Sequence, residues 1–184
     1  MSTNQLLINR VLDRTMAKDV ALVASGVAML VATAQLQIPF YPVPLTMQTL
    51  AVLLLAAGLG PVRSAASVLG YLSLGAAGLP VFAGFKNLLM ATTTWGYLVG
   101  FLVAAIVVGS IGSRWQLSNW YRVAVAFAVG SAVIYLFGIS GLMISLGIDA
   151  IAAFSAGVAP FLLGDLVKAA IAAALLPVAW RLAK

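Results

Sequence analysis

The last long apolar stretch of the sequence contains two charged residues, Asp165 and Lys168. A charged side chain inside a bilayer costs at least about 2.5 kcal/mol on insertion scales, so such residues are usually paired and mark a ligand site or a transport pathway. A spacing of three residues places both side chains on one face of a helix. The carboxylate can accept hydrogen bonds from ligand N–H groups, and the ammonium can donate to a carboxylate or another polar atom. We therefore predict a ligand site here; the alternative is a purely structural ion pair.

Other polar and aromatic residues are predicted to lie on the same, outer side of the membrane. Asn87 carries a donor and an acceptor on one amide and could complete the site from an outer loop. Thr46 and Gln48 open an apolar stretch after a proline-rich segment, where they either contact the ligand or satisfy loop backbone groups. Trp95 and Tyr97 belong to an aromatic group that forms either the walls of an apolar cavity or an interfacial belt.

The composition argues against an enzyme. The chain has no Cys, no His and no Glu, so it lacks the residues of disulfide frameworks, zinc sites and the common nucleophilic triads. It also has no G-x-x-x-x-G-K-[ST] loop, so any use of ATP has to occur on separate subunits. We predict no cofactor in this chain. The net charge of +6 is spread over segment ends, which is the membrane pattern and excludes a nucleic-acid patch.

Hydropathy assigns the chain to the lipid bilayer. It is 64% hydrophobic and 8% charged, with a mean hydropathy of +1.14, whereas soluble domains carry about 25% charged residues. We predict an all-α integral membrane protein in which residues 1–184 form a single transmembrane domain and residues 1–19 form a cytoplasmic arm. A bilayer-spanning helix needs about 20 apolar residues. The predicted spans are 20–38, 45–60, 63–79, 92–112, 120–146 and 155–180.

The distribution of Lys and Arg predicts the orientation. With both termini in the cytoplasm, the basic residues at segment ends lie inside, and only Lys86 lies outside. Lys168 then lies about 13 residues, or roughly 20 Å of helix, from Arg181, in the outer half of the bilayer. Segment 39–44 has three prolines and is predicted to be extended, and segment 80–91 is predicted to be a re-entrant loop.

Small residues recur every four positions in the first predicted span, at Ala24, Ala28 and Ala32. Such a face lets two helix backbones approach closely within a membrane. It can serve packing within the chain or docking of another membrane subunit, and the spacing leaves both open.

Four motifs, in order along the chain, resemble those of the BioY family, the biotin-binding S components of energy-coupling factor transporters. They are 42–50 (PVPLTMQTL), 70–84 (GYLSLGAAGLPVFAG), 96–101 (GYLVGF) and 160–168 (PFLLGDLVK). The loop between the second and third motifs lacks the proline and one glycine of the family pattern and carries Trp95.

The resemblance implies a six-helix S-component bundle in the cell membrane that captures biotin from outside. It implies that Asp165, Lys168 and Asn87 help to hold the vitamin, with the carboxylate of biotin near Lys168. It also implies a membrane coupling protein, meeting the alanine face, and two cytoplasmic ATPase subunits. The alternatives are a stand-alone or proton-coupled small-molecule permease that uses Asp165 and Lys168, and a membrane scaffold.

Overall fold

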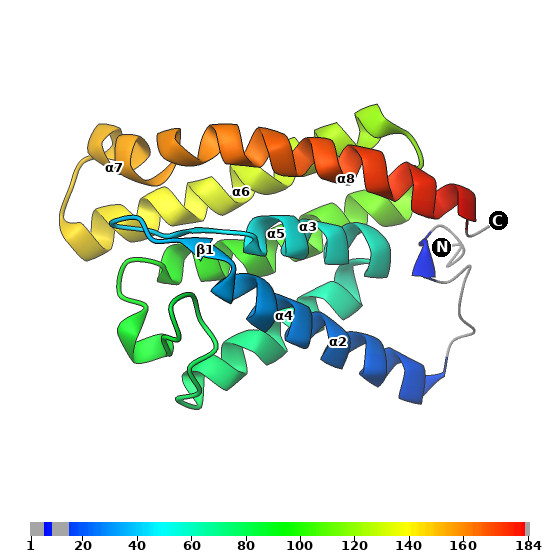
Figure 1. The fold of residues 1–184 in the computed structure, drawn as a ribbon, viewed down its shortest axis with the longest axis horizontal. Coiled ribbons are helices and arrows are strands. Elements are labelled where there is room, and N and C mark those ends of the chain that lie inside the picture. Colours follow the sequence, from blue (N-terminus) through cyan, green and yellow to red (C-terminus); the bar gives the residue numbers. More distant parts are fainter. Residues whose placement is uncertain (1–5, 9–14, 183–184) are drawn as a thin grey trace.

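The computed structural model describes residues 6–8 and 15–182, which form a bundle of helices with one short hairpin (Figure 1). The predicted all-α membrane architecture is confirmed, since the strands of the described residues are confined to that hairpin. The helices are α2 (Met16–Gln35), α3 (Gln48–Leu59), α4 (Pro61–Ala76), α5 (Trp95–Trp115), α6 (Trp120–Leu146), α7 (Ala150–Gly157) and α8 (Leu162–Leu182). The hairpin pairs β1 (Gln37–Ile38) with β2 (Leu45–Thr46), and two 3₁₀ turns are η2 (Leu88–Met90) and η3 (Ala159–Phe161). Most of the predicted arm 1–19 lies outside the described residues.

Within the described residues, four helical stretches are long and apolar enough to cross a bilayer. They are Met16–Gln35, Trp95–Trp115, Trp120–Leu146 and Ala150–Leu182. The other two predicted spans correspond to α3, with 12 residues, and α4, with 16 residues. Twelve residues of helix reach about 18 Å, which is less than the roughly 30 Å of the hydrocarbon core. A count of six complete crossings therefore stays a prediction.

The short helix α3 lies at the centre of the bundle. Seven of its 12 residues are buried, and it packs against α2, α4, α5 and α8. Its first turn follows directly on strand β2. A hydrogen bond joins the two elements, in which Thr46 Oγ1 accepts from the Gln48 backbone N–H at 3.3 Å. The hairpin thereby fixes where the polar start of α3 lies.

The stretch predicted as one helix over 155–180 is broken near its start. Helix α7 ends at Gly157, the turn η3 contains Pro160, and α8 begins at Leu162. Proline has no N–H to donate and disfavours helical geometry at the residue before it, which accounts for the break. As a result Asp165 lies in the first turn of α8, where the positive end of the helix dipole favours a carboxylate.

Helices α5 and α6 pack closely against each other through facing glycines. A Cβ atom on Gly96 would lie 2.4 Å from the carbonyl oxygen of Phe137 and 2.9 Å from the Cα of Gly141. In lipid, such close backbone approach gains dispersion contacts that larger residues would prevent. Helix α6 of this pair also packs against α8.

The two connections predicted to lie on the outer side, 39–44 and 80–91, differ from each other in structure. The proline-rich segment 39–44 forms the tip of the hairpin, whose register pairs Gln37 with Thr46. Of the predicted re-entrant segment 80–91, Val81, Phe82 and Ala91 are buried. Phe82 is buried against Tyr71, at 5.1 Å between ring centroids, whereas 84–86 and 88–90 are exposed. Figure 1 shows this loop, the hairpin and α7 at one end of the bundle, and the start of α2 and the end of α8 at the other.

Candidate functional site

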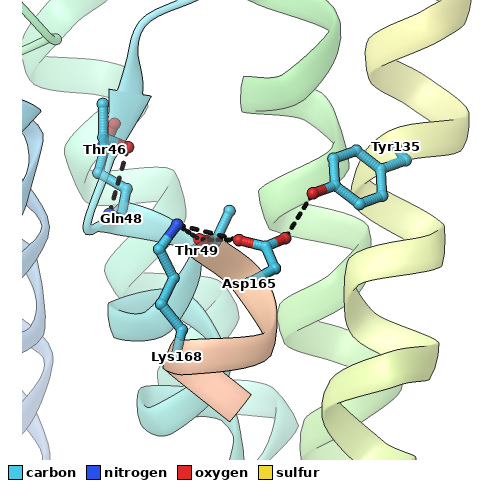
Figure 2. A network of polar contacts seen from close by, with 6 residues as sticks. All are labelled: Thr46, Gln48, Thr49, Tyr135, Asp165 and Lys168. Carbon is cyan, nitrogen blue, oxygen red and sulfur yellow. Dashed lines mark hydrogen bonds and ion pairs between the residues drawn. The ribbon is translucent and has the colours of Figure 1, made fainter. Parts of the chain in front are cut away.

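The charged pair in α8 forms the centre of a polar network that joins three helices (Figure 2). Lys168 Nζ lies 3.0 Å from Asp165 Oδ1 and donates a hydrogen bond to Thr49 Oγ1 at 2.7 Å. Tyr135 OH donates to the other carboxylate oxygen of Asp165 at 2.5 Å. Thr49 comes from α3 and Tyr135 from α6. Each of the two charged side chains is 13% exposed. The two charges are therefore largely shielded from solvent and are paired with each other.

A cavity opens beside this network. The space inside it, including the open solvent at its mouth, is about 680 Å³. Its polar wall is formed by Thr46, Gln48, Thr49, Lys86, Thr94, Tyr97, Tyr135 and Lys168. Its apolar wall is formed by Val43, Pro44, Phe82, Ala83, Leu98, Phe101, Ile134 and Phe161. A concave, largely apolar space with a few convergent polar groups is the usual form of a small-molecule site.

Four residues predicted from the sequence line the cavity: Thr46, Gln48, Tyr97 and Lys168. Asp165 is held by hydrogen bonds to side chains that line it. Two of these residues also serve the fold. The Gln48 amide donates to Tyr71 OH at 2.8 Å, and Tyr97 OH donates to the carbonyl of Gly157 at 2.8 Å.

Three predicted residues are not among those that line the cavity: Asp165, Trp95 and Asn87. Trp95 is 36% exposed, and its Nε1 donates to Ser145 Oγ at 2.8 Å. It stands two residues before Tyr97 on α5, a rotation of roughly 200°, so the two rings point to opposite sides of the helix. Asn87 donates from Nδ2 to the carbonyl of Gly78 at 3.4 Å, and its Oδ1 is buried without a partner. Asn87 therefore faces the end of α4 and not the polar network.

Tyr135 and Lys86 also line the cavity, although the sequence analysis does not name them as candidate site residues. Tyr135 is a hydroxyl-bearing residue in the middle of the 27-residue apolar helix α6, and buried Tyr hydroxyls usually have a polar partner. That signal was available in the sequence, but the partner lies 30 residues away. Lys86 was assigned only to the outer side as a topology marker.

The alanine face of α2 is exposed. Ala24, Ala28 and Ala32 are all exposed, whereas the buried residues of this helix are Gly26, Leu30 and Ala34. Packing within the chain thus uses a different face of α2, and the alanine face makes no close packing with the described residues.

Comparison with known proteins identifies relatives along almost the whole chain. The family model described as "BioY family" matches residues 3–184. The "Biotin transporter BioY" of Thermotoga maritima is 36% identical over 156 residues, which are 83% of this chain and 90% of that protein. The "Probable biotin transporter BioY" of Pyrococcus horikoshii is 39% identical over 159 residues, which are 85% of this chain and 92% of that protein.

A solved structure has a similar fold. The crystal structure of the S-component for biotin from an ECF-type ABC transporter superposes with a TM-score of 0.79. The superposition covers 99% of this chain and 94% of that chain at 22% sequence identity.

Proposed function

Because this chain belongs to the BioY family, we propose that it captures biotin from outside the cell and imports it as the substrate-binding subunit of an energy-coupling factor transporter. The observation that carries the proposal is the cavity lined by Lys168, whose ammonium pairs with the Asp165 carboxylate. The chain is a multi-pass membrane protein, and the membrane in question is the cell membrane. The family is one of transporters, so the chain is not an enzyme.

The polar end of the cavity matches the chemistry of a ureido ring. A ureido group presents two N–H donors beside one carbonyl acceptor. Asp165 is an acceptor for the donors, and Lys168 is a donor for the carbonyl. Since these two side chains interact at 3.0 Å, an acceptor and a donor lie side by side. Charge-assisted hydrogen bonds of this kind are stronger than neutral ones.

The remaining wall suits the rest of the ligand. Phe101, Ile134 and Phe161 are buried and face the cavity, and they offer apolar surface to a thioether ring and an aliphatic chain. Burial of such groups contributes about 25 cal/mol per Å² of apolar surface.

The partners follow from what the described chain exposes. The alanine face of α2, Ala24, Ala28 and Ala32, is exposed and is the docking surface for a membrane coupling protein. ATP hydrolysis belongs to separate cytoplasmic ATPase subunits, with both termini of this chain on their side of the bilayer.

The test is a ligand-dependent change in thermal stability of the purified protein in detergent. A ligand present at 100 times its Kd stabilises the folded state by about 2.7 kcal/mol, so biotin should raise the melting temperature. Asp165→Asn should abolish the rise. Asp149→Asn is the matched control, because Asp149 caps α7 through the Ala152 N–H at 2.8 Å and asparagine caps equally well.

Two results would contradict the proposal. A wild-type protein that gains no stability from biotin does not bind it. Uptake that collapses with the proton gradient and ignores ATP depletion would instead favour a permease that uses Asp165 as its proton carrier.

A further inference from the structure

Two ammonium groups line the cavity, and within the described residues only that of Lys168 forms an ion pair. Lys168 has Asp165 at 3.0 Å and also donates to Thr49 at 2.7 Å. Within residues 6–8 and 15–182, Lys86 forms no ion pair. The other outer carboxylate, Asp149, accepts from the start of α7. The deep pair is therefore electrically neutral, and Lys86 supplies the uncompensated positive charge of the cavity.

Building on the proposed function, we infer that Lys86 holds the carboxylate of the ligand at the outer mouth of the cavity and so selects anionic ligands over neutral ones. This differs from the prediction of a carboxylate near Lys168. An anion beside Lys168 would also lie beside the Asp165 carboxylate, and like charges at that range repel strongly where solvent is scarce. An anion beside Lys86 meets no such repulsion.

The position of Lys86 suits a charged end group. Lys86, Pro44 and Ala83 line both the cavity and an outer depression between the hairpin tip and the 80–94 loop. Lys86 is exposed, so a carboxylate there keeps part of its hydration. Because an ion is costly to bury and an amide-like head is less so, the ligand enters with its neutral ring first and its acid end last.

The backbone of Lys86 is fixed to the buried core. Phe82 N–H donates to the Lys86 carbonyl at 2.8 Å, and Lys86 N–H donates to the Phe82 carbonyl at 3.2 Å. The turn between them uses Gly84, whose φ of 72° favours glycine. Gln35 at the end of α2 clamps this turn, donating to the Phe82 carbonyl at 3.1 Å and accepting from the Phe85 N–H at 3.2 Å. Lys86 thus starts from a defined point at the cavity mouth.

The experiment compares a charged and a neutral form of one ligand. Binding of biotin and of biotin amide, which share the ring system, is measured by calorimetry on the full chain in detergent for wild type, Lys86→Gln and Lys86→Arg. The wild type should prefer biotin. A hydrogen bond to a charged group corresponds to a factor of roughly 10 or more in affinity, so Lys86→Gln should weaken biotin by about that factor and leave the amide within about twofold. Lys86→Arg should keep the preference.

The controls separate this inference from the proposed function. Lys18→Gln removes the same charge from the opposite end of the bundle and should leave both affinities unchanged, while the melting temperature of ligand-free Lys86→Gln reports its folding. An unchanged preference in Lys86→Gln overturns the inference, as does an equal loss of both ligands. If Lys168→Gln instead loses the preference for biotin over biotin amide, the carboxylate of the ligand binds at Lys168 and the inference is wrong. If wild type binds neither ligand, the proposed function fails first, whatever Lys86 does.

Discussion

Substitutions of Asp165 and Lys168 should have strongly non-additive effects on the unfolding free energy of the ligand-free protein. Each side chain is 13% exposed and the two charged atoms lie 3.0 Å apart. Removing one member of a buried pair leaves the other charge without a partner and costs about 3–5 kcal/mol, whereas replacing both members is far less costly. The perturbations are Asp165→Asn, Lys168→Met and the double variant. Asparagine keeps the shape of aspartate, and its carbonyl oxygen can still accept from Tyr135.

The magnitude follows from counting unpaired charges. Each single variant leaves one, so each should lose about 3 kcal/mol of unfolding free energy. The double variant leaves none and should lose no more than either single variant. The sum of the two single losses then exceeds the double loss by about 3 kcal/mol, within the range known for contacting residues.

The assay is unfolding of the purified protein in mixed micelles of increasing SDS content, followed by helical circular dichroism. Asp149→Asn serves as a distant control, and its effect should add to that of Lys168→Met within about 0.5 kcal/mol. A double variant that loses the sum of the two single losses would contradict this prediction, because the two charges would then contribute independently. Losses below about 1 kcal/mol in both single variants would show that the site is solvated like a surface ion pair.

Three further predictions concern other parts of the molecule. Tyr135→Phe removes the donor at 2.5 Å from Asp165 and should lower unfolding free energy by about 1.5–3 kcal/mol; wild-type stability would show that water replaces the hydroxyl. Gly96→Ala places a Cβ 2.4 Å from the Phe137 carbonyl oxygen and should lower the unfolding free energy by more than about 2 kcal/mol. The control, Gly58→Ala, has open space around the new Cβ and should be neutral or stabilising. Equal effects of the two variants on SDS unfolding would disprove the close α5–α6 contact. Ala28→Trp alters an exposed position and should spare biotin binding but block co-purification with a membrane coupling protein; unimpaired co-purification would place docking elsewhere.

Part of the candidate site could be predicted from the sequence alone, because that part depends on the free-energy cost of charges in lipid and on the spacing of residues within one helix. Charges are so unfavourable in lipid that Asp165 and Lys168 stand out without any structure, and a separation of three residues fixes their common face. The same logic identified the membrane class, and four ordered motifs identified the family. Tyr135 could have been added on the same ground, since a buried hydroxyl needs a partner.

The tertiary structure decided which residues meet. Thr49 and Lys168 are 119 residues apart and Tyr135 and Asp165 are 30 apart, and no periodicity within one helix reports which neighbour it packs against. Tyr97 lines the cavity and Trp95 does not. Which of the two residues of α5 faces the cavity depends on how α5 packs against α6 at Gly96. The sequence by itself determined that Asp165 and Lys168 are costly to place in a membrane, because this free-energy cost is a property of the charged residues themselves. Only the packing of α3, α6 and α8 decided what surrounds the pair, because contacts between distant segments arise from the arrangement of the helices as a whole.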